Sequence, residues 1–207
     1  RDLSNDEHRV GGRVVVPGVA LLDLALRQAG DGALISNLAW LRPISFDGGQ
    51  QLDELEIELV TTAGGRSREV VMVERDASAG NRRPFARWDV ASAASGAAPR
   101  LDLEGLRRQL PRDVSPVALY EDFARRGIRY GASYRRLAAL QTDGTRVLSR
   151  IVGGDLLNSS SPLIQSLDAA LQGVLVLAGS SNATTHVPFA IARARRYGPW
   201  NGDGHAF

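Results

Sequence analysis

Asp168 is the side chain whose sequence setting is best suited to proton transfer. It lies in 162–179, PLIQSLDAALQGVLVLAG, where apolar residues recur at helical spacing around nearly the whole circumference. We therefore expect a buried helix, with Gln172 one turn after Asp168 and within hydrogen-bonding reach of its carboxyl group. Burial disfavours the ionised carboxylate, so Asp168 should be paired or neutral. A neutral carboxyl group is a proton donor, although an aspartate held by backbone groups for structural reasons fits the pattern equally well.

A second segment, 6–30, contains a residue that can accept a proton. His8 belongs to the one residue type whose ordinary pKa lies close to neutral pH. It precedes a strand predicted at 14–16, and Pro17 is suited to open a helix over 18–28 because its missing N–H needs no partner there. This helix is also mostly apolar, and its LDLAL at 22–26 echoes LDAAL at 167–171. The repeated pattern predicts two similar halves, each built around a buried helix.

The residues of these two segments spell longer motifs. His8, Gly12 and Pro17 form HxxxGxxxxP, and Asp168 with Gln172 forms DxxxQ. Both resemble the signature motifs of the dehydratase domains of modular polyketide synthases, relatives of the β-hydroxyacyl thioester dehydratases of fatty acid synthesis. Three further stretches are similar in the same order: YGASY at 130–134, where the family has YGPxF, VLSR at 147–150 and VPFA at 187–190. The match covers most of the chain.

The resemblance implies an α+β double hot-dog fold, in which two curved antiparallel sheets each wrap around a central buried helix. The patterns agree, because the helix at 18–28 is followed by strands predicted at 34–46, 51–63, 68–76 and 85–94. We expect a first half over 1–96 with HxxxGxxxxP, a linker over 97–114 and a second half over 115–207 with DxxxQ. Family members usually carry further strands before His8 and after Tyr197, so we expect the C-terminal strands to be incomplete.

The same resemblance implies a hydro-lyase that removes water from a β-hydroxyacyl thioester and leaves an α,β-unsaturated thioester. Such a reaction needs a base for the α-proton and an acid for the departing hydroxyl group. A neutral histidine suits the first role, which we assign to His8. A carboxyl group whose pKa is raised by an apolar setting suits the second, which we assign to Asp168.

Four further residues are expected to bind or orient the substrate. Gln172 would orient Asp168, or else fill space in the helix packing. Tyr130 resembles the family tyrosine that lines the site near the substrate hydroxyl, and a half-buried sheet aromatic is its alternative. The N–H of Gly12, together with the start of the helix after Pro17, would stabilise the negative charge on the thioester oxygen. A tight turn and a helix start explain Gly12 and Pro17 under either interpretation.

In this family the substrate arrives on the phosphopantetheine arm of an acidic acyl carrier protein. The domain itself is therefore expected to bind no cofactor, and the histidine spacing and lack of cysteine predict no metal site. Arginines near the substrate entrance would attract the carrier, although each alone is more simply a solvated side chain. The candidates are Arg125, Arg126, Arg129, Arg135 and Arg136 around the tyrosine motif, with Arg193, Arg195 and Arg196 on the late strand.

Composition limits the other classes of function. The 207 residues are 43% hydrophobic, an ordinary globular composition that allows one large domain or two small ones. No cysteine is present and all 25 basic residues are arginine, which excludes a cysteine nucleophile and Schiff-base catalysis. The net charge of +2 argues against an arginine-rich RNA binder. No apolar run could span a bilayer and no signal-peptide pattern opens the chain, so we expect a cytoplasmic protein.

Two departures from the family pattern keep other roles open. Leu163 and Ile164 stand where the family usually has His-Pro before the acid, and Ala132 replaces the proline of YGPxF. The same scaffold serves relatives that shift double bonds, close pyran rings or act as non-catalytic partners in β-branching. Retention of both Asp168 and Pro17 favours ordinary dehydration. Neighbouring polyketide synthase domains are expected partners, and a homodimer is left open.

Overall fold

The computed structural model describes residues 7–30, 32–46, 55–61, 68–74, 84–91, 96–153, 161–178, 189–198, 200 and 203–207. The chain forms two compact units. Unit 1 comprises residues 1–15, 99–187 and 200–207, and unit 2 comprises residues 16–98 and 188–199. No helix in the described ranges is long and apolar enough to cross a membrane.

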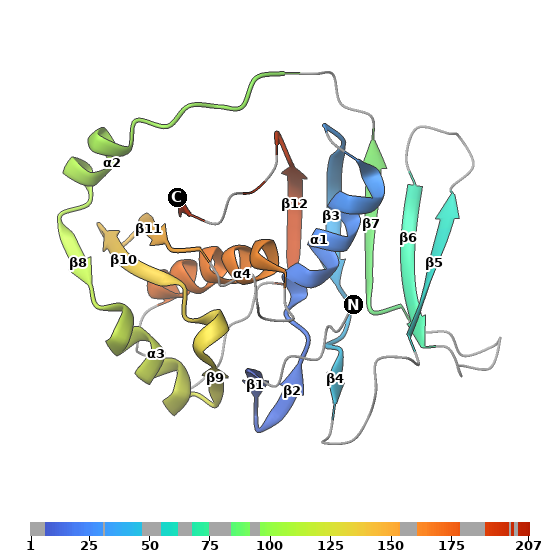
Figure 1. Ribbon diagram of the computed structural model, residues 1–207, viewed down its shortest axis with the longest axis horizontal. Helices are drawn as coiled ribbons and strands as arrows, with labels where there is room; N and C mark the ends of the chain where they lie inside the picture. Colours follow the sequence, from blue (N-terminus) through green and yellow to red (C-terminus); the bar gives the residue numbers. More distant parts are fainter. Residues whose placement is uncertain are drawn as a thin grey trace. The chain divides into compact units, whose positions relative to one another are not determined.

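Unit 2 is an antiparallel sheet covered by one helix. Its five strands run in the order β12-β3-β7-β6-β5, and α1 packs against β3 and β7 (Figure 1). Ala25 of α1, Ile35 and Leu38 of β3, and Trp88 of β7 are almost fully buried. The elements are α1 (Gly18–Ala29), β3 (Leu34–Trp40), β4 (Ser45–Phe46), β5 (Leu55–Thr61), β6 (Arg68–Glu74), β7 (Ala86–Ala91) and β12 (Ala190–Arg195).

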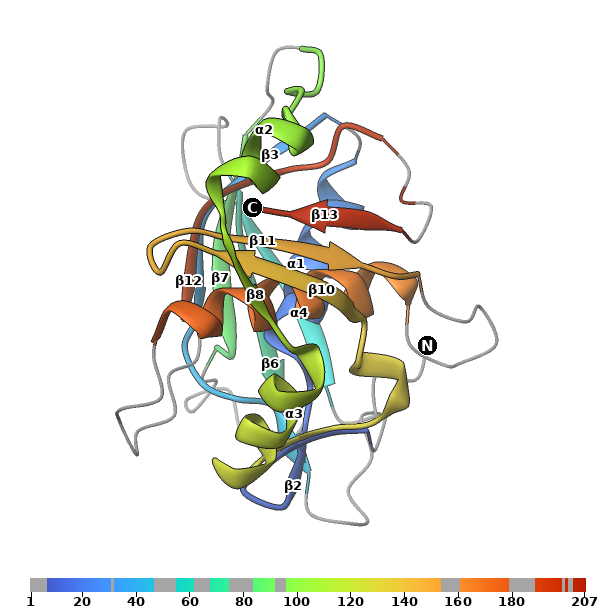
Figure 2. The same ribbon diagram turned by 90° about the vertical axis from the view of Figure 1, so that its left-hand side faces the viewer.

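Unit 1 contains a four-stranded antiparallel sheet with a helix packed on it. The strands run in the order β13-β11-β10-β8, and α4 contacts β10, β11 and β13 (Figure 2). Gly173 permits the close approach, because a side chain at this position of α4 would collide with the Ser149 hydroxyl of β11. These elements are β8 (Arg112–Val114), β10 (Leu137–Thr142), β11 (Val147–Ile151), α4 (Pro162–Val174), which continues as the 3-10 helix η3 (Leu175–Ala178), and β13 (Gly204–Ala206).

A smaller set of antiparallel strands in unit 1 carries His8. Strand β1 (His8–Val10) pairs on one side with β2 (Arg13–Val15) and on the other with β9 (Ile128–Tyr130). The helix α3 (Pro116–Arg125) leads into β9, and the 3-10 turn η2 (Ala132–Tyr134) follows it. The remaining helix, α2 (Leu103–Gln109), precedes β8.

Local signals set the ends of α3. Ser115 is the N-cap, and its hydroxyl oxygen accepts a hydrogen bond of 3.3 Å from the Ala118 N–H. Pro116 occupies the first turn, and Gly127 follows the helix with a φ of +83°, a conformation that favours glycine. Helix α1 begins at Gly18 as expected, with Pro17 as its N-cap, and ends at Ala29, one residue later than predicted.

The compact units differ from the predicted division into 1–96, 97–114 and 115–207. Residues 1–15 group with the later part of the chain, whereas 188–199 group with the earlier part. Strand pairing is the reason, because β1 pairs with β9 and β12 pairs with β3. The expected linker, 97–114, contains α2 and β8, and β8 is a sheet strand paired with β10. The strands β1, β8 and β13 were not predicted. Residues 187 and 188 of the VPFA stretch lie outside the described residues.

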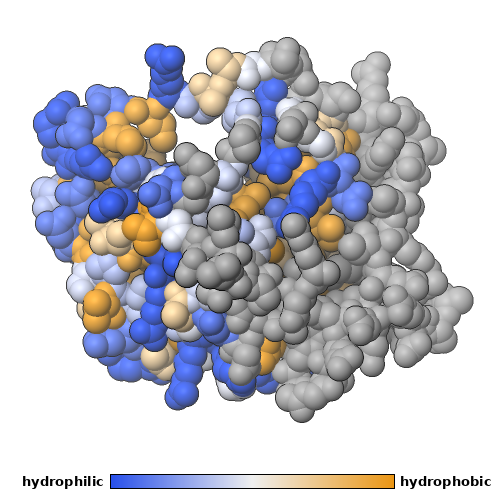
Figure 3. All heavy atoms as spheres, viewed as in Figure 1, coloured by the Kyte–Doolittle hydropathy of each residue, from blue (hydrophilic) through white to orange (hydrophobic). Residues whose placement is uncertain are grey.

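Hydrophilic residues predominate over α2, β8 and α3 on the face seen in Figure 3, and apolar residues form separate patches there. The exposed large apolar side chains include Leu101 and Val117. His8 and Asp168 do not belong to this surface, because both are buried. The residues with candidate chemistry therefore lie in the interior of unit 1.

Candidate active site

His8 is held in one tautomer by the strand beside it. Its Nδ1 atom lies 2.8 Å from the carbonyl oxygen of Val15. A carbonyl oxygen only accepts hydrogen bonds, so Nδ1 carries the proton and donates it. In the neutral form of this tautomer the lone pair is on Nε2, which has no hydrogen bond to any described residue. The β1–β2 pairing thus prepares His8 Nε2 to accept a proton.

Aromatic rings surround the imidazole. His8 is directly opposite Tyr130 in the β1–β9 pairing, and their rings meet edge-on with centroids 5.2 Å apart. The Tyr134 ring lies 5.6 Å away on η2. Tyr130 in turn contacts the rings of Tyr120 and Phe123 on α3, at 6.0 and 5.5 Å. This packing fixes the plane of the imidazole and gives the site an apolar wall.

Asp168 lies on the buried face of α4, one turn before Gln172. The Gln172 Nε2 atom donates a hydrogen bond of 2.7 Å to Asp168 Oδ2. Burial raises the pKa of the Asp168 carboxyl above its ordinary value, while the charge of His8 and the hydrogen bond from Gln172 act in the opposite direction. The electrostatic effect of His8 on Asp168 indicates that the two side chains lie near one another within unit 1.

Gln172 is fully engaged by its surroundings. Besides Asp168, its Nε2 donates a hydrogen bond of 3.1 Å to the carbonyl oxygen of Tyr134. Its Oε1 accepts a hydrogen bond of 2.9 Å from the Tyr120 hydroxyl. The residue is only 1% exposed, so these contacts replace water entirely. Gln172 therefore connects Asp168 to η2 and α3 through hydrogen bonds.

Tyr130 supplies a hydroxyl donor to the same space. Burial, followed by the nearby Asp168 and Tyr120, raises its pKa well above the ordinary value, so the phenol stays protonated at neutral pH. Its hydroxyl makes no hydrogen bond with the described part of the chain, although its backbone carbonyl accepts one of 2.9 Å from Arg135 Nε. His8, Asp168 and Tyr130 are thus close enough within unit 1 to influence one another electrostatically.

Two family models match the chain. The polyketide synthase dehydratase N-terminal domain matches residues 98–206, and the polyketide synthase dehydratase domain matches residues 4–74. The chain belongs to the polyketide synthase dehydratase domains.

Known relatives of this dehydratase domain are parts of long synthases. Polyketide synthase ThaG of Burkholderia thailandensis is 32% identical over 93% of the chain, and PksN of Bacillus subtilis is 24% identical over 93%. The chain spans about 4% of the length of each of these relatives. The matching region is thus one domain among others in a modular synthase.

Solved structures establish the fold. The dehydratase domain from the CurF module of curacin polyketide synthase superposes with a TM-score of 0.83 at 16% identity, covering 98% of this chain and 76% of that one. A trans-AT polyketide synthase dehydratase domain from Brevibacillus brevis gives a TM-score of 0.78 at 22% identity, covering 95% and 74%. These matches confirm the α+β double hot-dog expected from the sequence.

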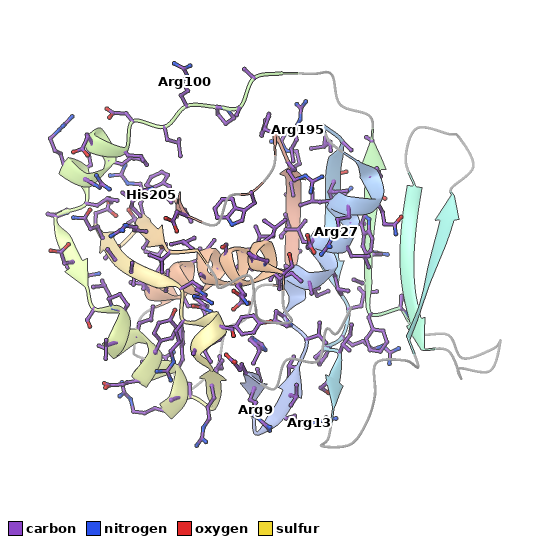
Figure 4. All side chains as sticks on the ribbon, viewed as in Figure 1. Arg9, Arg13, Arg27, Arg100, Arg195 and His205 are labelled. Atoms are coloured by element: carbon purple, nitrogen blue, oxygen red, sulfur yellow. The ribbon has the colours of Figure 1, made fainter. Side chains whose placement is uncertain are left out.

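Gly12 is not brought to the site of the dehydratase domain. Gly11 and Gly12 form the two-residue turn between β1 and β2, with φ values of +59° and +85°. Gly12 is exposed, and its carbonyl oxygen accepts a hydrogen bond of 2.9 Å from Arg9 Nη1. Arg9 and Arg13 flank the turn, and this end of the hairpin points away from α4 (Figure 4). Strand β1 ends at Val10, so Gly12 lies beyond the end of the strand that carries His8. The expected contact of its N–H with a thioester oxygen is therefore not supported, and the glycine serves the turn. Pro17 lies in unit 2 as the N-cap of α1.

Several of the arginines expected to attract a carrier protein make contacts with other residues of the domain itself. Arg135 lies over the Tyr120 ring, 5.5 Å from its centroid, and Arg136 donates to Ser133 O and to Gln165 Oε1. Arg125 and Arg126 both pair with Asp122 on α3. Arg129 is exposed on β9. The remaining three, Arg193, Arg195 and Arg196, belong to unit 2.

Two residues of the site were missed by sequence reasoning. Glu7 holds η2 against β1, because its carbonyl oxygen accepts from the Gly131 N–H and its Oε2 accepts from the Ser133 N–H, both at 2.6 Å. A side chain at position 131 would collide with Glu7. Tyr120 on α3 anchors Gln172. No local pattern marks Glu7, and the only signal for Tyr120 is its place on the apolar face of α3.

Proposed function

We propose that this domain removes water from a β-hydroxyacyl thioester carried on the phosphopantetheine arm of an acyl carrier protein, as a hydro-lyase of polyketide synthesis. The observation that carries the proposal is the meeting of His8 Nε2, which keeps its lone pair, with a buried Asp168 whose pKa is raised. Membership of the dehydratase family supports the reaction class.

The proposed step is an elimination that begins at the α-carbon. His8 Nε2 takes the α-proton, and the electrons of that C–H bond form the new C=C bond. The β-C–O bond breaks, and Asp168 gives its proton to the departing hydroxyl group, which leaves as water. The cycle ends with a protonated imidazole and a carboxylate, and transfer of one proton from His8 to Asp168 restores the starting state.

Tyr130 is the proposed donor to the substrate hydroxyl or to the thioester oxygen. Its phenol is protonated at neutral pH and has no hydrogen bond to a described residue. The aromatic wall excludes water from the imidazole and thereby favours proton transfer from carbon. The domain binds no cofactor of its own in this scheme, since the carrier protein brings the substrate, and neighbouring synthase domains supply it.

Incubation of the protein with a racemic 3-hydroxyacyl pantetheine thioester tests the proposal. We expect loss of one water, followed by mass spectrometry, and a decrease of at least about 100-fold in rate for His8→Gln. Arg108→Gln, which changes an exposed residue of α2, is the matched control and should keep the wild-type rate. A wild-type protein without dehydration activity on pantetheine and carrier-protein substrates would point instead to a non-catalytic dehydratase-like domain. Migration of a double bond or ring closure without net loss of water would indicate the other variants of this scaffold.

A further inference from the structure

We propose that Tyr120 is a positioning residue for the catalytic acid: acting through Gln172, it determines that Asp168 carries its transferable proton on Oδ1. This inference rests on the proposed dehydration and goes beyond it, because it assigns a role to a residue outside both signature motifs. It follows from three hydrogen-bonding steps, each with only one possible direction.

The first step fixes the direction of the Tyr120 hydroxyl. The Leu137 N–H, which can only donate, points to the Tyr120 hydroxyl oxygen at 3.3 Å. The single hydroxyl proton is then directed to Gln172 Oε1, 2.9 Å away. Burial raises the pKa of Tyr120 to about 12, so this proton stays in place at every pH at which the domain would work.

The second step fixes the Gln172 amide. Because Oε1 accepts from Tyr120, the amide nitrogen faces the Tyr134 carbonyl oxygen at 3.1 Å and Asp168 Oδ2 at 2.7 Å. A flipped amide would turn Oε1 towards the Tyr134 carbonyl, which cannot donate. Two backbone groups of fixed polarity, the Leu137 N–H and the Tyr134 C=O, therefore determine which end of the amide meets Asp168.

The third step concerns the two oxygens of Asp168. An oxygen that accepts a hydrogen bond in a neutral carboxyl group is the carbonyl oxygen, so the acid proton belongs on the other one. Asp168 Oδ2 accepts from Gln172, whereas Oδ1 has no hydrogen bond to the described part of the chain. The proton on Oδ1 is thus available to a substrate hydroxyl group. Without the Tyr120 hydroxyl, Gln172 Oε1 loses its donor, the amide is held only at its nitrogen end, and its hydrogen bond to Asp168 Oδ2 weakens.

Tyr120→Phe tests the inference, because it removes the hydroxyl and keeps the ring that packs on Phe123, Tyr130 and Arg135. We expect kcat for dehydration to fall about 10- to 100-fold with KM nearly unchanged, as for a misplaced catalytic group. Because activity requires protonated Asp168, the rate should fall at high pH as Asp168 loses its proton, which gives the high-pH limb of the pH–rate profile. Since the hydrogen bond from Gln172 lowers the pKa of Asp168, its weakening should move that limb to higher pH.

Two controls separate positioning from a loss of structure. Phe123→Leu disturbs the same ring cluster and leaves the hydrogen bonds, so it should lower the melting temperature without moving the limb. Tyr120→Phe made on a Gln172→Leu background should cause no further loss of rate, because both changes break one chain of contacts. Additive losses, or an unmoved limb in Tyr120→Phe, would overturn the inference.

A direct titration keeps the result independent of the proposed reaction. NMR of protein labelled with ¹³C at the aspartate carboxyl carbons, with Asp168→Asn used for assignment, reports the Asp168 pKa without any substrate. A higher Asp168 pKa in Tyr120→Phe than in the wild type supports the inference even if no dehydration is found. Equal values contradict it, whatever the activity.

Discussion

Helices α1 and α4 carry an aspartate in the same local setting, and the residue one turn later differs. Asp23 and Asp168 each follow a proline, Pro17 and Pro162, by six positions, and both side chains are buried. In α1 the residue at i+4 is Arg27, which forms an ion pair with Asp23. In α4 that residue is Gln172, which gives a neutral hydrogen bond to Asp168.

The difference shows how one framework yields a structural aspartate and a candidate acid. Arg27 compensates the charge of Asp23 with a charge of its own, so that aspartate is held as an ion pair. The amide dipole of Gln172 compensates only part of the cost of burying a charged carboxylate, so burial still raises the pKa of Asp168. The i+4 neighbour therefore separates the two roles, and the LDLAL and LDAAL repeats alone do not.

The largest expected effect is on turnover by the two matched variants Asp168→Asn and Asp23→Asn. We expect Asp168→Asn to lower kcat for dehydration by about 10³-fold, since an amide cannot protonate the departing hydroxyl. The kcat of Asp23→Asn should stay within about threefold of the wild-type value when it is assayed below its melting temperature, because Asp23 is not one of the two residues proposed to transfer protons. Equal losses in the two variants would mean that the helices do not differ in the way described.

The second-largest effect is expected when Gln172, the residue four positions after Asp168, is replaced. Gln172→Arg places the α1 arrangement on α4, where a guanidinium would hold Asp168 as a carboxylate and lower its pKa. We expect a loss of about 100-fold in kcat and a high-pH limb moved to lower pH, the opposite direction to Tyr120→Phe. A pH–rate profile checks both. Gln172→Glu, which keeps the size without the positive charge, should leave the limb where it is or raise it.

Stability should change in opposite directions for the same pair of substitutions. Asp23→Asn leaves Arg27 without its partner, so we expect the free energy of unfolding to fall by about 1–3 kcal/mol. Asp168→Asn removes a buried ionisable group and keeps its shape, so we expect it to be neutral or to add about 1 kcal/mol. Urea denaturation at neutral pH measures both values.

The stability effect at Asp168 should depend on pH. Its folded-state pKa is raised above the unfolded value, so the group's contribution is fully present below the unfolded pKa and is lost as pH rises through the folded pKa. The gain of Asp168→Asn over the wild type should therefore grow as the pH rises above the ordinary aspartate pKa of about 4. A gain that is constant or shrinks over this range would show that Asp168 is ionised throughout.

The smallest effect is expected at the β1–β2 turn. Gly12→Ala forces a side chain into a φ of +85°, which should cost about 1 kcal/mol of unfolding free energy. Dehydration by the folded variant should be unchanged, because Gly12 lies at the far end of β1 from His8. A large loss of kcat without a loss of stability would restore the oxyanion role that the sequence motif suggests.

Much of the chain could be predicted because the signals are local. The N-cap at Ser115, the stop at Gly127 and the apolar periodicity of 162–174 act through neighbouring residues, so α3 and α4 begin and end nearly where expected. Strands β1, β8 and β13 have three residues each, too few for a period-two pattern, and they exist because partner strands supply their hydrogen bonds. Gly12 was assigned to the substrate because a sequence motif does not distinguish a residue required for a turn from one that contacts the substrate.

The sequence by itself determined the contact between Asp168 and Gln172, since i, i+4 spacing brings the two side chains together on any helix. Only the tertiary structure decided how these groups are poised. The Val15 carbonyl sets the tautomer of His8, and Tyr120 sets the orientation of Gln172. Both contacts depend on hydrogen-bond direction between segments brought together by folding, and neither direction is written in local sequence.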